Sequence, residues 1–308
     1  MVDLLDSCAL PPPGACLAVA VSGGPDSMAL AWLLRERPGL VALTVDHGLR
    51  PESGAEAERV GRWLAAWGVA HHILRADVPR PQAGLQAWAR ALRHRLMAAL
   101  CGQRGIAHLA LAHHADDQAE TLVFRLAKGS GLTGLAGMRS VQAMDGLTLV
   151  RPLLAARKAD LLALCAQQGV PFVRDPSNAS LRFARVRLRS ALEVEGGTGP
   201  RLARTAARLA RADAALEAWA QEAWSARAHV EGGTTTLDLD GLPEEVRLRL
   251  LALAMGRLAP SPYGPPLEKL ERLTAVLAEP APFRRRTLAG VVVSRSPQGH
   301  AVLTRERR

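Results

Sequence analysis

The chain has 308 residues, of which 48% are apolar and 22% are charged, a composition typical of a globular protein with one large and one smaller domain. No apolar run reaches the ~20 residues of a membrane-spanning helix, and the first residues lack the basic start of a signal peptide. The four cysteines form no CxxC pair, which disfavours a zinc site or a disulfide framework. We therefore expect a cytoplasmic protein with reduced thiols and no membrane partner.

The formal net charge is +10. Such a basic balance favours polyanionic partners, most often nucleic acids. Arginines spread over a solvated surface would give the same total, so the position of the charges has to decide.

Apolar runs and amphipathic stretches alternate between residues 16 and 170. The runs expected as strands are 16–21, 40–45, 69–74, 106–112 and 147–150. The helical patterns between them lie near 25–36, 52–67, 83–102, 115–127 and 156–168. Continuous apolar strands between amphipathic helices are typical of a parallel sheet covered on both faces. Right-handed crossovers then predict a doubly wound α/β domain with strand order 3-2-1-4-5.

This alternation stops at residues 174–189, where a turn precedes a dense basic stretch. We expect a linker at 196–200 and a long helix at 201–228, with Arg204, Arg208 and Arg211 along one side. A small α+β region follows, with a strand at 234–242, helices at 243–259 and 266–277, and a hairpin at 284–306 that turns at residues 297–299. The predicted domains are 1–195, a linker and basic helix at 196–230, and 231–308.

The first chemistry-bearing stretch follows the first strand and reads Ser22-Gly23-Gly24-Pro25-Asp26-Ser27. A glycine pair before a helix N-terminus frees backbone N–H groups to hold a phosphate, and the two serines add hydroxyl donors. The stretch lacks the Gly-Lys-Ser/Thr ending of a Walker A loop. Asp26 would repel a phosphate unless a cation bridges them, so it indicates Mg²⁺ or a role in steering charge. A tight turn in which Asp26 stabilises the helix start is the alternative.

A second stretch, TVDHGLR at 44–50, ends the second strand. Asp46 would bind a ribose hydroxyl in a dinucleotide site, border adenine and ribose in a mononucleotide site, or cap a helix.

A third stretch, HLALAHHADDQAET at 108–121, ends the fourth strand. His113 and His114 point to opposite sides if the strand continues through them, so they make a poor metal site. Asp117 and Glu120 are spaced i, i+3 and share a helix face, which suits a substrate ammonium or Mg²⁺. Acidic residues favoured at a helix N-terminus are the alternative.

These stretches converge if the predicted strand order is right. The sheet reverses between its first and fourth strands, and ligands of such sheets bind at that point, outside the carboxyl ends of the strands. The first and third stretches would then face each other across one crevice, with the second beside them.

The assembled motifs resemble the PP-loop ATP pyrophosphatase superfamily, whose turn reads SGGxDS, and more narrowly the tRNA(Ile)-lysidine synthetase family. The resemblance covers about residues 16–190 in order. Its motifs are SGGPDS, VDHGLRPESGAEA, AWARALRHR, HHADDQAET, AKGSGLTGLAGM, RPLL and DPSNASLRFARVRLR.

The resemblance implies an enzyme that joins L-lysine to the cytidine at the first anticodon position of a tRNA(Ile) with a CAU anticodon. ATP adenylates the cytosine and releases diphosphate, and the lysine amine then displaces AMP. The implied ATP-binding residues are Ser22 to Ser27 with Asp46 and His47, and Asp26 also lies near Mg²⁺. The implied lysine pocket is His113, Asp117 and Glu120. Asp26, Asp116 and Asp117 are the implied catalytic carboxylates, and the implied partners are tRNA(Ile) and L-lysine. A homodimer of the chain is a further prediction.

The attacking amine must be neutral, so its surroundings have to lower its pKa. The residues expected to contact tRNA are Arg185, Arg187, Arg189, Arg204, Arg208 and Arg211. For the three on the long helix, a solvated surface is the alternative.

The chain departs from the family pattern in places. Val186 stands where the family has an Asn, Lys128 where it has an Arg and His94 where it has a Tyr. The chain resembles the short forms of the family, which must discriminate among tRNAs with less protein. A tRNA-thiolating enzyme of the superfamily would use cysteines, usually as CxxC, and amidotransferase-type members such as GMP synthetase lack VDHGLR and DxSN. A tRNA-binding module without catalysis is a further alternative, but the nucleotide-site residues are all present.

Overall fold

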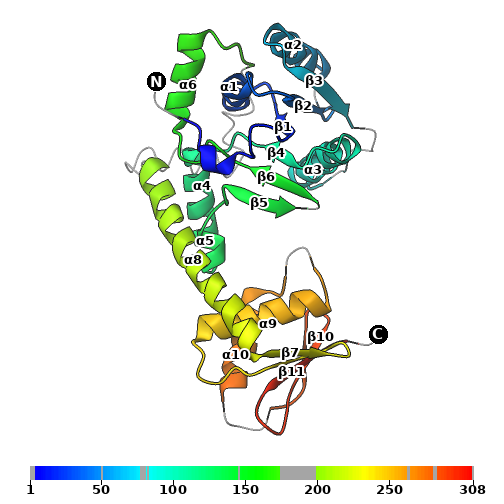
Figure 1. The fold of residues 1–308 in the computed structure, drawn as a ribbon, viewed down its shortest axis with the longest axis vertical. Coiled ribbons are helices and arrows are strands. Elements are labelled where there is room, and N and C mark those ends of the chain that lie inside the picture. Colours follow the sequence, from blue (N-terminus) through cyan, green and yellow to red (C-terminus); the bar gives the residue numbers. More distant parts are fainter. Residues whose placement is uncertain are drawn as a thin grey trace. The chain divides into compact units, whose positions relative to one another are not determined.

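The computed structural model describes residues 4–49, 51–76, 81, 83–144, 146–173, 199–261, 264–279 and 283–306. The chain divides into two compact units (Figure 1). The first unit contains Met1–Ser130 and Gly134–Arg208, and the second contains Gly131–Thr133 and Leu209–Arg308. Arg185, Arg187, Arg189 and Val186 lie outside the described residues.

The first unit is built on a six-stranded sheet with the order β3-β2-β1-β4-β6-β5. Five strands are parallel: β1 (Leu17–Ala20), β2 (Val41–Asp46), β3 (Ala70–Arg75), β4 (His108–Ala110) and β6 (Leu147–Val150). They are the five predicted strands in the predicted order. The predicted α/β fold is therefore confirmed, with the reversal between β1 and β4.

The sixth strand, β5 (Val141–Met144), pairs antiparallel with β6 and was not predicted. A hairpin of this kind has a sequence signature, because Asp145-Gly146 separates two short β-prone runs. Gly146 has a φ of +78°, which glycine adopts without steric cost. The sequence therefore contained the information that would have placed this strand.

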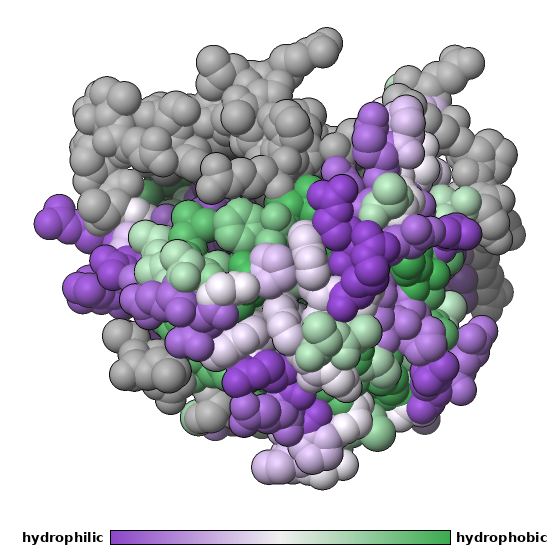
Figure 2. Space-filling model, turned by 90° about the horizontal axis from the view of Figure 1, so that it is seen from above, coloured by the Kyte–Doolittle hydropathy of each residue, from purple (hydrophilic) through white to green (hydrophobic). Residues whose placement is uncertain are grey.

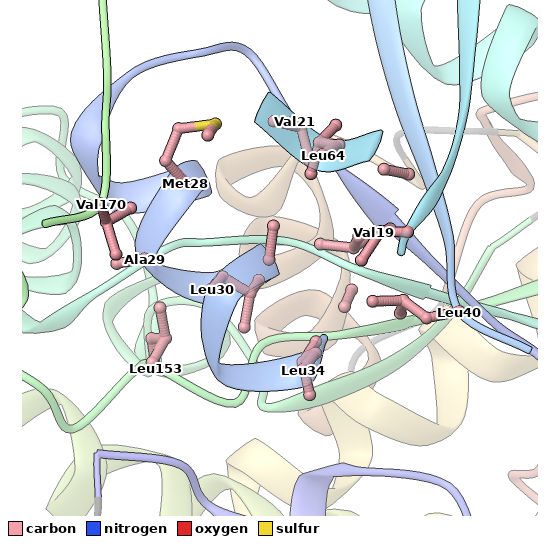
Figure 3. Close-up of a cluster of buried hydrophobic side chains, with 14 of the residues drawn as sticks. Val19, Val21, Met28, Ala29, Leu30, Leu34, Leu40, Leu64, Leu153 and Val170 are labelled. Carbon is pink, nitrogen blue, oxygen red and sulfur yellow. The ribbon is translucent and has the colours of Figure 1, made fainter. Parts of the chain in front are cut away.

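Successive side chains of β1 point to opposite faces of the sheet, and helices pack against both of these faces. Leu17 and Val19 pack in the same core cluster as α1 (Pro25–Leu34), α2 (Ser53–Ala66) and α6 (Lys158–Gln168), as Figure 3 shows in part. Ala18 belongs to a second cluster, which contains Met97 and Cys101 of α3 (Leu85–Gln103). Each large side chain buried in these clusters contributes about 1.5–3 kcal/mol to the stability of the fold. The clusters on the two faces therefore keep the sheet edge that carries the site in a fixed position.

Three further elements complete the first part of the chain: the 3-10 helix η1 (Ser7–Ala9), α4 (Ala115–Leu126) and the one-turn α5 (Leu132–Leu135). The described residues of the molecule show a mixture of hydrophilic and smaller apolar areas on the face drawn in Figure 2. Among the described residues, no helix combines the length and the apolar character required to cross a bilayer.

The second unit packs helices against one antiparallel sheet, whose order is β7-β8-β11-β10-β9. The strands are β7 (Ala228–Glu231), β8 (Thr234–Leu237), β9 (Arg286–Leu288), β10 (Val291–Arg295) and β11 (Ala301–Arg305). Alternate apolar residues of the sheet form one core with α9 (Glu244–Leu258), α10 (Leu267–Ala278) and the end of α8 (Gly199–Arg227). The predicted helices and the predicted hairpin are present, whereas β7 and β9 were not foreseen. Helix α8 already begins at Gly199, inside the stretch expected to be a linker.

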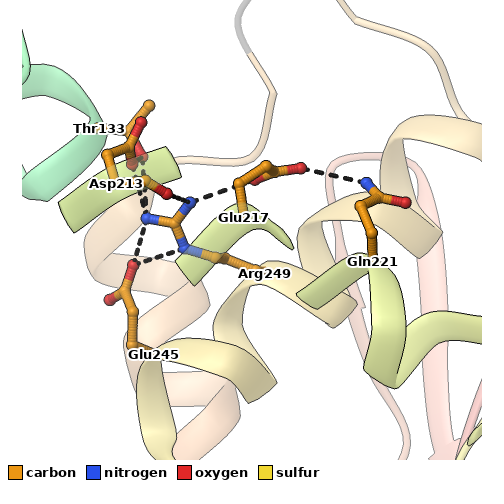
Figure 4. Close-up of polar contacts among 6 residues, drawn as sticks. All are labelled: Thr133, Asp213, Glu217, Gln221, Glu245 and Arg249. Carbon is orange, nitrogen blue, oxygen red and sulfur yellow. Dashed lines mark hydrogen bonds and ion pairs between the residues drawn. The ribbon is translucent and has the colours of Figure 1, made fainter. Parts of the chain in front are cut away.

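A buried arginine, Arg249 of α9, contacts α8 and the segment Gly131–Thr133 within the second unit (Figure 4). Arg249 of α9 pairs with Asp213 of α8 at 2.7 Å and with Glu245 at 2.9 Å. It also donates to the hydroxyl of Thr133 at 3.3 Å, and that hydroxyl donates to Asp213 at 2.7 Å. Removing one partner of such a buried group costs about 3–5 kcal/mol. The segment Gly131–Thr133, expected to be part of a glycine-rich loop, is therefore anchored by α8 and α9.

Candidate active site

The turn between β1 and α1 is organised by its own side chains. The N–H of Ser22 donates to the hydroxyl of Ser27 at 3.1 Å, and that hydroxyl donates to the carbonyl of Gly24 at 3.0 Å. Gly24 precedes the helix in an extended conformation, and Pro25 occupies the first turn, where a missing N–H costs nothing. The first N–H groups of a helix have no intrahelical partner, so this turn presents donors and a positive dipole end to an anion.

Gly23 gives a direct test of the turn. Its φ is +86°, and a Cβ at this position would lie 2.8 Å from Cγ2 of Val60. A left-handed conformation costs other residues about 1–2 kcal/mol, and the contact adds to that cost. We expect Gly23→Ala to weaken ATP binding by at least about tenfold, measured by calorimetry. Gly102→Ala is the control, because its Cβ meets nothing within 4 Å, and it should bind ATP normally. Normal ATP binding by both variants would contradict the assignment of the phosphate site to the Ser22–Ser27 turn.

A cavity of 390 Å³ opens beside this turn. Its walls come from the turn, the end of β2, the start of α2, helix α3 and the segment after β4. The residues predicted from the sequence that line it are Ser22, Gly24, Asp26, Ser27, Asp46, His47 and His113. A cavity at the point where a doubly wound sheet reverses is where such folds bind nucleotides.

Asp46 lies at the cavity wall, and it does not cap α2, whose N-cap is Glu52. Its Oδ1 accepts hydrogen bonds from the N–H of Gly48 at 2.9 Å and from the hydroxyl of Ser53 at 2.6 Å. Burial opposes ionisation, but these hydrogen bonds outweigh it and lower the pKa of Asp46. The carboxylate therefore holds the turn before α2 in place and stays charged at the cavity wall.

Two histidines of the cavity wall are neutral at neutral pH. Burial lowers the pKa of His47, and burial lowers that of His113 to about 4. Both ring nitrogens of His47 and Nδ1 of His113 are buried and have no hydrogen-bond partner among the described residues. Buried polar atoms of this kind require an explanation, and a ligand in the cavity would supply the missing partner.

His114 is the centre of a charged cluster next to the cavity. Its side chain is 2% exposed, and its ring nitrogens lie 3.6 Å from Oδ2 of Asp26, 3.4 Å from that of Asp116 and 3.5 Å from that of Asp117. Burial alone would lower the pKa of His114, but the carboxylates of Asp116, Asp26 and Asp117 outweigh it and raise this pKa to about 9. The contact with the imidazolium of His114 in turn lowers the pKa of Asp116 to about 2. His114 is therefore an imidazolium at neutral pH.

Lys158 adds a second cation to the cluster. Its Nζ lies 3.7 Å from Oδ2 of Asp26, and its backbone N–H donates to Oδ2 of Asp116 at 2.8 Å. Burial opposes ionisation of Asp26, yet His114 and Lys158 together lower its pKa. Among the described residues of the cluster, three carboxylates and two cations leave one net negative charge.

The structure corrects one prediction for this region. The fourth strand ends at Ala110 and not at the histidines, so alternation along a strand does not set their directions. Asp117 and Glu120 both lie on α4 at the predicted i, i+3 spacing. Asp117 is turned toward His114 and accepts a hydrogen bond from the N–H of that residue. Glu120 is 4% exposed, and neither carboxylate is among the described residues that line the cavity.

Two residues of the cluster, His114 and Lys158, were missed. Lys128, Lys158 and Lys269 are the lysines of a chain with 39 basic residues, so a lysine at the start of a predicted helix was a usable indication. His114 was considered only together with His113 as a metal site, and no other role was predicted for it. Within the described residues, no group of three or more His, Cys, Asp or Glu side chains is arranged to hold a metal ion.

The predicted RNA-binding arginines that the structure describes are all exposed. Arg204, Arg208 and Arg211 lie on α8 at the predicted i, i+4, i+7 spacing. Lys128 is exposed as well, and its ammonium lies 4.4 Å from the ring centroid of Phe124.

The fold, the glycine turn and the cavity at the sheet reversal define a PP-loop nucleotide-binding protein, and the profile of the PP-loop domain family matches residues 4–195. The structure resembles that of a U34-tRNA thiolase from Methanococcus maripaludis, with a TM-score of 0.54 at 18% identity over 64% of this chain and 72% of the other. That likeness supports the fold alone.

Proteins of similar sequence identify the family within the class of PP-loop nucleotide-binding proteins. A tRNA(Ile)-lysidine synthase from Methylobacterium nodulans is 48% identical over 86% of this chain and 81% of its own length. A second, from Rhodopseudomonas palustris, is 42% identical over 90% of this chain and 87% of its own. The chain belongs to the tRNA(Ile)-lysidine synthase family.

Proposed function

We propose that this protein ligates L-lysine to C2 of the cytidine at the first anticodon position of a CAU-anticodon tRNA(Ile), converting ATP to AMP and diphosphate. The observation that carries the proposal is the cavity beside the SGGPDS turn with the anionic cluster of α4 next to it. A phosphate cradle suits the ATP that activates the cytosine, and an anionic cluster suits the α-ammonium of a lysine whose other amine attacks. Membership of the family supports the same reaction.

In the first half-reaction, O2 of cytosine attacks the α-phosphorus of ATP, and diphosphate leaves. We assign the phosphates of ATP to Ser22–Ser27, because the N-terminus of α1 begins there and its first N–H groups have no intrahelical partner. We assign the nucleoside to the end of the cavity that contains Asp46 and His47. His47 is neutral and its ring nitrogens lack partners, so it can both donate to and accept from a base or a ribose.

Asp26 fits a shared Mg²⁺. Its Oδ1 is buried and has no hydrogen-bond partner in the part of the chain that the structure describes, while its Oδ2 faces His114 and Lys158. Mg²⁺ sites on nucleotides commonly use one or two carboxylates together with phosphate oxygens, which matches one free carboxylate oxygen at a phosphate turn. The ion would neutralise charge on the departing diphosphate. Lys158 and His114 supply positive charge at the same place, which reduces the repulsion between the Asp26 carboxylate and a phosphate.

In the second half-reaction, a lysine amine attacks C2, AMP leaves, and the amine loses a proton. We propose that Asp117, with Asp116 and Asp26, attracts the α-ammonium, since the cluster carries one net negative charge. His113 lies at the cavity wall as a neutral ring and is proposed to belong to the lysine pocket. Glu120, which is buried three residues after Asp117 on α4, is proposed to belong to the same lysine pocket.

One incubation tests the proposal as a whole. The protein is mixed with ATP, labelled lysine and either CAU-anticodon tRNA(Ile) or methionine tRNA. Label should pass to the former alone, with one AMP formed for each lysine incorporated. Label on neither tRNA, or on both equally, would contradict the proposed function.

The basic helix α8 is proposed to contact tRNA phosphates, together with Arg185, Arg187 and Arg189. Replacing Arg204, Arg208 and Arg211 by alanine should weaken tRNA binding and reduce the slope of log K against log salt by about 2–3, because each lost phosphate contact removes about 0.7–0.9. Filter binding at several salt concentrations measures the slope. A control that replaces the exposed Arg59, Arg62 and Arg104 removes the same charge and should leave the slope unchanged. An equal change in both variants would show that only net charge matters.

We also propose that the protein acts in the cytoplasm and that it forms a homodimer. Residues 1–195 would then form the ATP-binding catalytic domain, residues 196–230 the linker and basic helix, and residues 231–308 a small α+β domain. Light scattering of the purified protein tests the dimer, and a mass of 32.8 kDa would contradict it.

A further inference from the structure

Helix α8 begins beside α4 (Figure 1), and its first residue, Gly199, lies directly against the aspartate cluster. A Cβ built on Gly199 would lie 2.6 Å from Oδ1, 3.1 Å from Cγ and 3.4 Å from Cα of Asp116. Both residues belong to the first unit. Gly199 is helical, so this position requires glycine for space and not for an unusual backbone conformation. A residue without a side chain is what lets the two helices approach this closely.

The carboxylate of Asp116 is held on its other side as well. Its Oδ2 accepts a hydrogen bond at 2.8 Å from the N–H of Lys158, the first residue of α6, and lies 3.4 Å from Nδ1 of His114. With a Cβ at Gly199, Oδ1 would have to move by about 0.8 Å to reach the 3.4 Å of ordinary van der Waals contact. That movement would disturb both the hydrogen bond and the ion pair. Asp116 therefore joins the starts of α4, α6 and α8, and its position depends on where α8 lies.

The same end of α8 carries exposed arginines. Arg201, Arg204 and Arg208 are exposed and are spaced i, i+3, i+7, which places them along one face of the helix. An α-helix rises 1.5 Å per residue, so Arg201 and Arg204 lie about 3 Å and about 7–8 Å along the axis from Gly199. Arg201 therefore extends the predicted row of arginines to the first turn of the helix. One helix thus presents cations to the solvent at a fixed distance from the aspartate cluster.

We propose that Gly199 is a positioning residue for the amino-acid substrate. Through its contact with Asp116, α8 holds the aspartate cluster in the arrangement that attracts the ammonium of this substrate. The same contact sets the distance between the cluster and the RNA phosphates that the arginines of α8 bind. This inference rests on the proposed function and adds that one helix serves both substrates, since it binds the RNA and fixes the carboxylates that attract the lysine.

The test compares Gly199→Ala with Gly256→Ala, a matched control on α9 whose Cβ meets nothing within 4 Å. Alanine favours a helix more than glycine does, so both variants should keep their helices. In Gly199→Ala, KM for lysine should rise by about 10- to 100-fold, the range expected for weakening an interaction with a charged group, while kcat stays within about threefold. The Kd for ATP from calorimetry and the Kd for tRNA from filter binding should both stay within about twofold. Gly256→Ala should match the unmodified protein in all four quantities.

Three results would overturn the inference. The first is an unchanged KM for lysine in Gly199→Ala with normal kcat. The second is a lower kcat at unchanged KM, together with a lower free energy of unfolding in urea, because the contact would then have a structural role alone. The third is a higher Kd for tRNA with a normal KM for lysine, since Gly199 would then place only the arginines. Failure of the proposed function is seen separately, as no lysine incorporation by the unmodified protein.

Discussion

Replacing Asp117 by asparagine is expected to lower kcat/KM for lysine by at least about 100-fold while leaving ATP affinity within about twofold. The carboxylate cluster loses its one net negative charge, so nothing remains to attract the substrate ammonium, and hydrogen bonds to charged groups contribute about 1.5–3 kcal/mol each. ATP affinity should persist because Asp117 is not among the described residues that line the cavity. Lysine incorporation into tRNA and calorimetry with ATP measure the two quantities.

Asparagine is the informative substitution because it preserves the local structure. The N–H of His114 donates to Oδ2 of Asp117 at 3.1 Å at the start of α4, and an asparagine oxygen can accept the same bond. Alanine would also remove this cap, at a cost of about 1 kcal/mol. Asp240→Asn is a matched control, because that carboxylate is exposed and accepts from the N–H of Gly241 at 3.0 Å. Normal lysine incorporation by Asp117→Asn would refute the ammonium site.

Replacing His114 by glutamine is expected to destabilise the protein by about 3 kcal/mol near pH 6.5, the lower end of the cost of breaking a buried ion pair from one side. Three carboxylates would lose their shared cation. Urea unfolding followed by circular dichroism gives the free energy of unfolding.

The dependence on pH is more specific than the size of the loss. The pKa of His114 is raised from 6.5 to about 9 in the folded protein. Its contribution to stability is therefore fully present below pH 6.5 and is lost as pH rises through about 9. The unmodified protein should lose stability over this window, and His114→Gln should lose less. Measurements above pH 6.5 avoid the opposite effect of His113, whose pKa is lowered.

His229→Gln is the control for this experiment. His229 is exposed on β7 and should change neither the stability nor its slope with pH. A slope in His114→Gln equal to that of the unmodified protein would mean that the imidazolium does not hold the cluster together.

The sequence by itself determined the framework of this protein. A strand whose two faces are both buried must be apolar at every position, and an amphipathic helix must repeat its apolar residues every 3.6 positions. These periods located the five parallel strands, and crossover handedness with the glycine turn predicted their order. The strand order then brought SGGPDS, Asp46 and His113 to one edge, where they line one cavity. Strand β5 and its hairpin with β6 were not predicted, because such short runs show little periodicity, although Asp145-Gly146 indicated the turn.

Only the tertiary structure decided how the charges at that edge are paired. His113 and His114 lie after the end of β4, outside any regular element, so no period fixes which way their rings point. His113 faces the cavity, and His114 faces three aspartates. Lys158 reaches Asp26 across 132 positions of sequence, a contact that packing of α6 beside α1 creates. Glu120, three residues after Asp117, is buried instead of open to the cavity. The reason is physical: periodicity sets which face of an element is buried, whereas the partner of a charge depends on which elements the fold packs together.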